Sequence, residues 1–462
     1  MDYGKTLHLP ATEFPMRGNL PKREPEILKF WEDNKIYEKR LEKRQGNKPF
    51  VLHDGPPYAN GKLHIGHALN KTLKDIIMKY KTMQGYYTPY IPGWDTHGLP
   101  IEHAVIKNTG LNRHEMSPLD LRAKCKEYAL QCVEEQKKDF IRFGVLGRWE
   151  NPYVTLRPAF EVKEIGIFGE MAKRGHIYKG LKTVYWCTHC ETALAEAEIE
   201  YKEKKSFSIY VKYAYLQEVK RTLPADVPTD KAYAVIWTTT PWTLPASQAI
   251  SVNPELTYSW VQVGDEYYLM ATDLVEAALK DCGVEEYKVL NTFSGEELEM
   301  ATFKHPFIER TVPVFLGDHV TLDAGTGCVH TAPAHGEEDF GVYMKYKNDG
   351  KVDFEIASFV GPTGEYVSAV DNDRYGDTEQ SLAGVEIHDA EVPILKIVAH
   401  NGALLHKGTL RHQYAHCWRC KNPVIYRATE QWFSSVDGYR QQALDVIDNQ
   451  VQWIPKWGHD RI

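Results

Sequence analysis

The sequence has 462 residues, 43% of them hydrophobic, and a formal net charge of −8 at pH 7. This length is enough for two to four domains with substantial cores. The negative charge excludes a surface that attracts nucleic acid everywhere, so such a partner would have to meet a local basic patch.

Other compositional features point to a soluble protein. No apolar run approaches the roughly 20 residues of a membrane span, and the start MDYGKTLHLP does not resemble a signal peptide. Eight cysteines in such a chain favour metal ligands or core thiols over a disulfide framework. We therefore expect a cytoplasmic, multidomain protein without a membrane partner.

The amino-terminal part is predicted to be α/β. A charged surface helix is expected over residues 24–45 and a buried strand over Phe50–His53. The glycine- and proline-rich turn that follows is not a Walker loop, because five residues separate Gly55 from Gly61 and Leu63 stands where that motif needs Ser or Thr.

A second strand and a long helix follow in the same part of the chain. The segment YYTPYIP is predicted as a short strand that leads into the turn-rich GWDTHGLPIE, and open α/β sheets bind ligands at such strand ends. Ser117, Pro118 and Asp120 carry the signature of a helix start, and we expect Cys125 and Cys132 on that helix to be core thiols.

From about residue 205 the pattern changes to short strands separated by turns, including FSIYVKYAYL, AYAVIWTTTPWT, YSWVQVG, EYYLMA and TVPVFLG. This pattern predicts a β-rich domain that continues to about residue 405. Because α/β patterns stand on both sides of it, we interpret the domain as an insertion.

The tetrad His64-Ile65-Gly66-His67 opens a predicted helix, whose apolar positions recur at helical spacing: Leu69, Leu73, Ile76, Ile77 and Tyr80. Free backbone N–H groups and the dipole at a helix start attract anions, and two imidazoles there can donate hydrogen bonds to phosphate oxygens. Gly66 leaves room for a flat ring such as adenine against the backbone. The alternative is a purely structural helix start, which the setting in an α/β turn disfavours.

Two C-x-x-C pairs, Cys187 with Cys190 and Cys417 with Cys420, bracket the β-rich region. Each pair supplies half of a tetrahedral thiolate site, so together they predict one closed structural Zn²⁺ site. A redox role for one pair is the alternative. We expect Cys282 and Cys328 to be packing residues.

These motifs resemble the amino-terminal half of isoleucyl-tRNA synthetases, class I aminoacyl-tRNA synthetases of the bacterial type. The resemblance covers essentially the whole chain and rests on PPYANGKLHIGH, GWDTHGLPIE, VIWTTTPWTLPAS, GTGCVHTAPAHGEEDF and CWRCKNPVIYRATEQWFSS. The valine enzymes resemble PPNVTG before the tetrad, and the leucine and valine enzymes carry TTRP where this chain has TTTP.

The resemblance implies ATP-dependent activation of isoleucine and its transfer to tRNA(Ile), with Mg²⁺ on the phosphates. His64 and His67 would stabilise the reacting phosphate, and Gly66 would back the adenine. The amino-acid site would include Pro56 and Tyr58, and Asp95 would pair with the α-ammonium of isoleucine.

The β-rich insertion then implies hydrolytic editing, because a pocket discriminates poorly against a substrate one methylene smaller, and isoleucine against valine in this enzyme family is the standard example. Thr238, Thr239 and Thr240 would offer hydroxyls to the terminal adenosine and to a hydrolytic water. Asp339 would hold the α-ammonium of misattached valine, and His330 would limit side-chain size. Ser247 stands where the family usually has Asn, which affects a contact with the tRNA end.

The predicted fold class is therefore α/β: a Rossmann-like class I synthetase nucleotide-binding domain interrupted by a β-rich editing domain. The expected domains are an extension (1–47), the first catalytic part (48–186), a zinc knuckle and linker (187–204), the editing domain (205–405) and a return to the catalytic domain (406–462).

No K-M-S-K-S-type segment occurs in the sequence. We therefore expect the chain alone to activate isoleucine slowly, and we expect a monomer. One alternative remains open at this point: a fragment or paralogue that only edits or only binds tRNA. A small nucleotidyltransferase that also uses H-x-G-H is disfavoured by the inserted β-rich domain and the threonine run.

Overall fold

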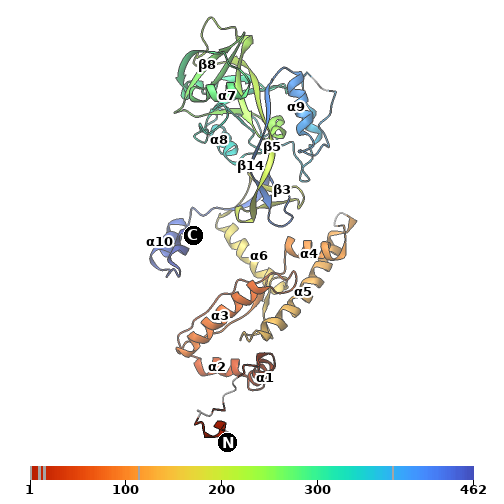
Figure 1. Cartoon of the computed structure of the whole chain (residues 1–462), viewed down its shortest axis with the longest axis vertical. Helices are drawn as coiled ribbons and strands as arrows, with labels where there is room; N and C mark the ends of the chain where they lie inside the picture. Colours follow the sequence, from red (N-terminus) through yellow and green to blue (C-terminus); the bar gives the residue numbers. More distant parts are fainter. Residues whose placement is uncertain (1–2, 9–11, 14–16, 113–114, 377–378) are drawn as a thin grey trace. The chain divides into compact units, whose positions relative to one another are not determined.

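The computed structural model describes residues 3–8, 12–13, 17–112, 115–376 and 379–462. The chain divides into two compact units, residues 1–176 and 177–462, and Figure 1 shows their elements. Within the described ranges, none of the helices combines the length and apolar character needed to cross a bilayer.

The first unit is mostly helical with short parallel pairings. After a 3-10 turn (Tyr3–Thr6), its elements are α1 (Leu20–Asp33), α2 (Ile36–Arg44), α3 (Ile65–Met83), β1 (Gly93–Trp94), α4 (Leu99–Thr109), α5 (Pro118–Arg142), β2 (Tyr153–Val154) and α6 (Pro158–Lys173). Strands β1 and β2 pair in parallel, as expected for an α/β arrangement. Trp94, Phe140 and Trp149 form the centre of the core.

The start of α5 confirms its sequence signature. Ser117 is the N-cap, and its hydroxyl accepts a hydrogen bond of 3.2 Å from the backbone N–H of Asp120. Pro118 occupies the first helical position, where its missing N–H is not needed. Cys132 is buried as predicted, whereas Cys125 is only partly buried.

Three sequence predictions for this unit are wrong. The single helix over 24–45 is two helices, because Lys35 has the left-handed backbone conformation that ends α1 and begins α2. Phe50–His53 is not a buried strand: Val51 is 69% exposed, and the pairing beside the segment is an isolated parallel bridge between the preceding residue, Pro49, and Tyr87. The strand expected in YYTPYIP lies one segment later, at β1.

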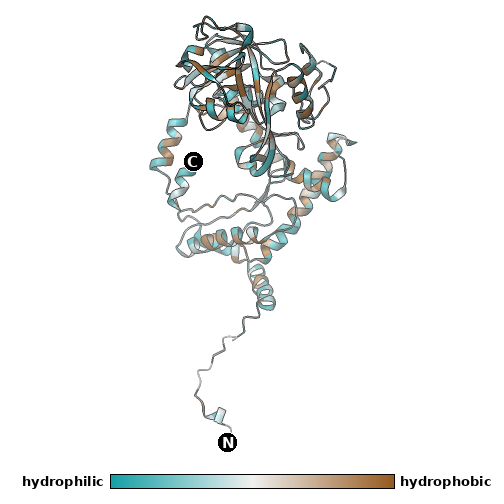
Figure 2. Cartoon of the chain, turned by 45° about the horizontal axis from the view of Figure 1, so that its top comes forward, coloured by the Kyte–Doolittle hydropathy of each residue, from teal (hydrophilic) through white to brown (hydrophobic). Residues whose placement is uncertain are grey.

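Helix α3 is confirmed, but its apolar side is not the side that is buried. Leu69, Leu73, Ile76, Ile77 and Tyr80 are between 43% and 62% exposed. The opposite side, with Lys71, Met78 and Thr82, faces the interior. Hydrophobic and hydrophilic residues alternate along the helices of this unit (Figure 2).

The second unit is built on a large mixed sheet with strand order β10-β8-β9-β6-β5-β11-β12-β7-β13, and β14 pairs with β5. Its strands are β5 (Ile199–Gln217), β6 (Ala232–Thr238), β7 (Ala249–Val252), β8 (Thr257–Val263), β9 (Glu266–Ala271), β10 (Lys288–Ser294), β11 (Thr302–Lys304), β12 (Thr311–Leu316), β13 (Val329–Thr331) and β14 (Leu404–Cys417). These strands confirm the β-rich pattern read from the sequence.

Helices and short 3-10 segments cover this sheet. They are the helices α7 (Val275–Asp281), α8 (Glu337–Asn348) and α9 (Glu391–His400) and the segment η5 (Pro241–Ala246), which follows β6. Helix α10 (Arg440–Asn449) buries none of its residues. Apolar residues of alternate positions on β5, β6, β8 and β12 form the main core, with α9 packed against it.

Strands β5 and β14 form a long antiparallel ribbon, in which Ile199 lies opposite Cys417 and Val211 lies opposite Leu404. At the end of the ribbon lies a separate three-stranded sheet in the order β15-β3-β4, with β3 (Ile177–Cys187), β4 (Thr192–Leu194) and β15 (Ile425–Ser434). The ribbon therefore joins the β-rich part to the strands on either side of it in sequence. The domain boundaries drawn from the sequence stay a prediction.

Candidate functional site

The H-x-G-H tetrad lies at the amino end of α3, where the two histidines form a reciprocal cap. The Gly66 N–H donates to Nδ1 of His64 (3.1 Å), and the His64 N–H donates to Nδ1 of His67 (3.2 Å). The ring centroids are 3.9 Å apart. Because both Nδ1 atoms accept, both neutral rings carry their proton on Nε2, and these N–H groups are available to an oxyanion.

Two further features suit this helix start to a phosphate. Partial burial, with His64 nearby, lowers the pKa of His67, so its ring is neutral near pH 7. A Cβ on Gly66 would lie 2.9 Å from Cε1 of His64, so only glycine permits the cap. Gly66 is exposed, which leaves its backbone open to a flat ring.

The residues predicted for the amino-acid site lie on the loop before α3 and beside it. Tyr58 and Asp95 form an isolated parallel bridge, in which the Asp95 N–H donates to Pro57 O and the Ala59 N–H donates to Asp95 O, both at 2.9 Å. Tyr58 is 38% exposed and Pro56 is half-buried. The structure therefore brings Tyr58 and Asp95 together.

A buried ion pair holds this loop against α3, and the sequence analysis missed it. Asp54 is 1% exposed and pairs with Lys71 and Lys74 of α3; its oxygen lies 2.6 Å from Lys74 Nζ. Gln136 of α5 adds bonds to the carbonyls of Tyr58 and Gly61. The only sign of this ion pair in the sequence was the i, i+3 spacing of Lys71 and Lys74, and such spacing is common on solvated helices.

In the second unit, the threonine run ends strand β6 and turns into η5. Thr238 is buried, and its hydroxyl accepts from the Thr240 N–H (3.1 Å). The hydroxyl of Thr243 donates to Thr240 O (2.8 Å) and lies 3.2 Å from Nε2 of His330. Since the hydroxyl proton is already used, His330 must donate from Nε2, which leaves Nδ1 as an acceptor.

His330 lies on β13, which runs beside β6. The side chain is 7% exposed, and burial lowers its pKa to about 4, so the ring is neutral. Its Nδ1 is buried and has no partner among the described residues. The structure thus joins His330 to the threonine run through Thr243, a residue that sequence reasoning missed although it lies one helical turn after Thr240.

Asp339 lies in the first turn of α8, and its carboxylate accepts from the Ala332 N–H (2.8 Å). Burial raises its pKa to about 6, while the bond from Ala332 opposes this shift. Gly336 precedes the helix, and a Cβ there would lie 2.7 Å from the carboxylate. Residues 332–336, which we call the pocket loop, therefore join His330 to Asp339.

Ser247 is placed differently from the other predicted residues. It is fully buried, and its hydroxyl accepts a bond of 3.0 Å from the Tyr213 hydroxyl. Arg310 donates to its backbone carbonyl (2.6 Å). In this structure Ser247 therefore supports the segment behind the threonine run and does not line its open side.

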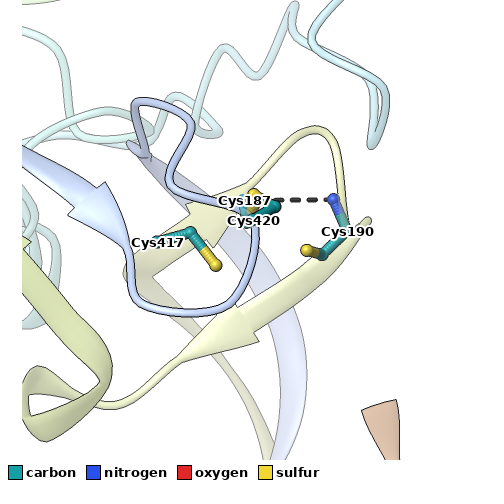
Figure 3. A group of neighbouring side chains, drawn as sticks. All are labelled: Cys187, Cys190, Cys417 and Cys420. Atoms are coloured by element: carbon teal, nitrogen blue, oxygen red, sulfur yellow. Dashed lines mark hydrogen bonds between the residues drawn. The ribbon is translucent and has the colours of Figure 1, made fainter. Parts of the chain in front are cut away.

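The four predicted cysteines converge at the end of the ribbon, and Figure 3 shows Cys187 and Cys190 on one turn and Cys417 and Cys420 on another. Their sulfurs all lie within 4.8 Å of one another, and three of the four residues are buried. The Sγ atoms of Cys187 and Cys420 are 3.5 Å apart, far longer than a disulfide.

The donor set fits a tetrahedral Zn²⁺ ion, whose four thiolate ligands lie at about 2.3 Å from the metal. The residue after each pair, Glu191 or Lys421, has a left-handed backbone conformation, so the two turns have matching shapes. Hydrogen bonds from the Cys190 thiol and N–H lower the pKa of Cys187, which favours a thiolate there, whereas the bond to Cys187 and burial raise the pKa of Cys190.

Comparison with known proteins adds family information. A family model described as tRNA synthetases class I (I, L, M and V) matches residues 26–462. The Isoleucine--tRNA ligases of Caldicellulosiruptor bescii and Moorella thermoacetica are each 54% identical over all of this chain, which corresponds to 48% and 47% of those proteins. The chain thus spans about half the length of the curated relatives it matches.

Two solved structures are more distant. A ternary complex of Agrobacterium radiobacter K84 agnB2 LeuRS with tRNA and LeuAMS is 16% identical, with a TM-score of 0.35, over 89% of this chain and 52% of that chain. The structure titled GlLeuRS-CP1 is 17% identical, with a TM-score of 0.34, over 44% of this chain and 99% of that chain.

Proposed function

The chain belongs to the class I tRNA synthetase family, and from that premise we propose that it carries two sites of an isoleucine-tRNA ligase. The first unit would activate isoleucine with ATP, and the second would hydrolyse valine from mischarged tRNA(Ile). The relatives named isoleucine--tRNA ligase, 54% identical over the whole chain, support the choice of isoleucine.

Activation is an in-line substitution at phosphorus. The isoleucine carboxylate attacks the α-phosphorus of ATP, the bond to the bridging oxygen of pyrophosphate breaks, and isoleucyl-adenylate forms. The Nε2–H groups of His64 and His67, whose Nδ1 atoms are used in the cap, donate to the phosphate oxygens as negative charge develops. Mg²⁺ bound to the ATP phosphates would neutralise charge on the leaving group.

The amino acid is held by charge and by contact with the loop before α3. Asp95 pairs with the α-ammonium, and the backbone bridge to Tyr58 fixes its position. Pro56 and Tyr58 contact the substrate, and Gly66 backs the adenine. A terminal ribose hydroxyl of the tRNA then attacks the carbonyl carbon of isoleucyl-adenylate and displaces AMP.

Editing is ester hydrolysis. A water molecule attacks the ester carbonyl of valyl-tRNA, the bond to the ribose oxygen breaks, and valine and tRNA leave. Asp339 holds the α-ammonium, and the hydroxyls of Thr238, Thr239 and Thr240 orient the terminal adenosine and the water. His330, fixed by Thr243, forms a wall that admits valine and excludes isoleucine.

The observation that carries this proposal is the reciprocal histidine cap, because it uses both Nδ1 atoms as acceptors and so leaves Nε2 as the donor nitrogen of each ring at a helix start. The test of activation is isoleucine-dependent exchange of pyrophosphate into ATP. It is measured with the chain alone and with the chain joined to the remainder of a relative's sequence, and the chain alone is expected to be orders of magnitude slower.

An alternative function is editing or tRNA binding without synthesis. The complete network of Thr243, His330 and the pocket loop favours it as the activity retained by the chain alone. Exchange that stays absent in the joined protein, with intact hydrolysis of valyl-tRNA, would select this alternative and reject the ligase.

The remaining parts of the proposal concern partners and metal. tRNA(Ile) is the macromolecular partner, and the chain acts as a cytoplasmic monomer. Since the net charge is −8, tRNA binding should be weak and sensitive to salt, so assays need low ionic strength. Cys187, Cys190, Cys417 and Cys420 would hold one Zn²⁺ ion, which would fix the base of the ribbon.

A further inference from the structure

The pocket loop is fastened to the three-stranded sheet, which carries none of the residues predicted for editing. The Thr183 hydroxyl of β3 donates to Pro333 O (2.6 Å), and the Ala428 N–H of β15 donates to Ala334 O (2.8 Å). Two successive carbonyls of the loop are thus held by two neighbouring strands.

His335 supplies a third bond to the same sheet. Its Nδ1 lies 2.9 Å from Tyr426 O, and because a carbonyl only accepts, Nδ1 must carry the proton. The side chain is 8% exposed, and its ring meets Trp242 edge-on with centroids 5.0 Å apart. Burial lowers its pKa to about 4, so this neutral tautomer persists near pH 7.

The other nitrogen of His335 is unusual. Nε2 is buried and makes no hydrogen bond within the described part of the chain. A buried polar atom left without a hydrogen bond is unfavourable, because it has lost its bonds to water. An apolar residue at position 335 would fill the same space without an unsatisfied nitrogen. The advantage of the His335 imidazole over such a residue is therefore its Nδ1–H bond to Tyr426 O.

The position of the loop explains why such fastening matters. One end continues from His330, and the other leads to Asp339, whose carboxylate is tied to the Ala332 N–H. A movement of the loop would therefore displace His330, which is proposed to limit side-chain size, relative to Asp339, which is proposed to hold the α-ammonium. Displacements of about 1 Å at a reacting site can lower rates by about 100-fold.

We propose that Thr183 and His335 are positioning residues of the hydrolytic site, which hold the pocket loop to strands β3 and β15 through the Pro333 and Tyr426 carbonyls. The inference rests on the proposed editing function. It also connects the pocket to the cysteine cluster, because β3 ends at Cys187 and β15 follows Cys420.

The first test replaces His335 in two ways. In His335→Asn the side-chain amide can stand near the place of Nδ1 and donate to Tyr426 O, whereas in His335→Gln it reaches the place of Nε2. We expect kcat/KM for deacylation of valyl-tRNA(Ile) to stay within about threefold in the Asn variant and to fall by about 10- to 100-fold in the Gln variant. The reverse order would overturn the proposal, because Nε2 would then act on the substrate directly.

The second test uses a matched pair at Thr183. Thr183→Ser keeps the hydroxyl and should behave as the parent, whereas Thr183→Val keeps the shape, loses the donor, and should lose about tenfold in kcat/KM. Equal rates for the Ser and Val variants would also overturn the proposal.

The final readout does not depend on activity. Hydrogen exchange of the Ala332 and His335 amides, both bonded within this region, should accelerate in Thr183→Val and not in Thr183→Ser, while the strands of the large sheet keep their protection. Unchanged exchange would refute positioning. If the parent protein itself fails to deacylate valyl-tRNA, the proposed function fails, and the exchange data still decide the positioning.

Discussion

His64 is exposed and uses Nδ1 to cap α3, which leaves Nε2 as its donor nitrogen, so its two proposed roles can be separated by substitution. In His64→Asn the side-chain oxygen can still accept from the Gly66 N–H, but the Nε2–H donor is lost. We expect unchanged unfolding in urea and a fall in isoleucine-dependent pyrophosphate exchange of about 100-fold or more in the joined protein.

His64→Ala is the matched variant. It should lose exchange to the same extent and also destabilise the first unit by about 1 kcal/mol, because the cap is gone. Parent-level exchange in His64→Asn would mean that this donor does not reach the phosphate.

The raised pKa of Asp339 leads us to predict how editing depends on pH. Its carboxylate must be ionised to hold an α-ammonium, and burial raises its pKa to about 6. As pH falls through 6, the protonated fraction rises and kcat/KM for valyl-tRNA deacylation should fall about tenfold per pH unit. His330, with a pKa of about 4, stays neutral over this range. A profile that is flat from pH 7 to 5 would contradict the role of Asp339.

At the scale of elements, α3 shows that a hydrophobic pattern can predict a helix without predicting which side of it is buried. The spacing of Leu69, Leu73 and Ile76 predicted a helix correctly, yet the stripe is exposed and Met78 on the other side is 1% exposed. Periodicity identifies a helix and its apolar side, whereas the side that is covered depends on the partners available.

This exposure gives a stability prediction. Leu69→Lys combined with Leu73→Lys should change the unfolding free energy of the first unit by no more than about 0.5 kcal/mol per site and weaken binding of an apolar dye. Met78→Ala, the buried control, should destabilise the unit by about 2–5 kcal/mol. A large destabilisation by the double lysine variant would show that the stripe is packed in solution.

Local motifs were the most predictable part of the site. The four cysteines were found because each pair is fixed by its own turn, and the cap at Ser117 was found because its signature spans only four residues. Thr183, Thr243 and His335 were missed because their importance comes from contacts with residues distant in sequence or across a turn, such as Pro333 and Tyr426. The break at Lys35 was missed because neither Gly nor Pro marks it.

At the scale of the whole molecule, the cysteine cluster joins positions 227 residues apart, since 417 − 190 = 227. We expect one zinc ion per chain in protein purified without added zinc. Its removal should lower the unfolding temperature of the second unit by roughly 5–10 °C.

The matched variants separate this site from other thiols. Cys187→Ser with Cys420→Ser should abolish zinc binding, whereas Cys125→Ser, outside the cluster, should leave it unchanged. A zinc content near zero in the parent, or zinc retained by the double variant, would reject the site.

The two proposed chemistries lie in separate units, so they can be measured separately. The central claim is that the second unit hydrolyses misattached valine and spares isoleucine. The most direct measurement compares deacylation of valyl-tRNA(Ile) and isoleucyl-tRNA(Ile) by the chain at low salt. We expect hydrolysis of the valyl ester only, its loss in Asp339→Ala, and hydrolysis of isoleucyl-tRNA as well in His330→Ala, because the wall is removed. Deacylation of valyl-tRNA by Asp339→Ala at the parent rate would contradict the account.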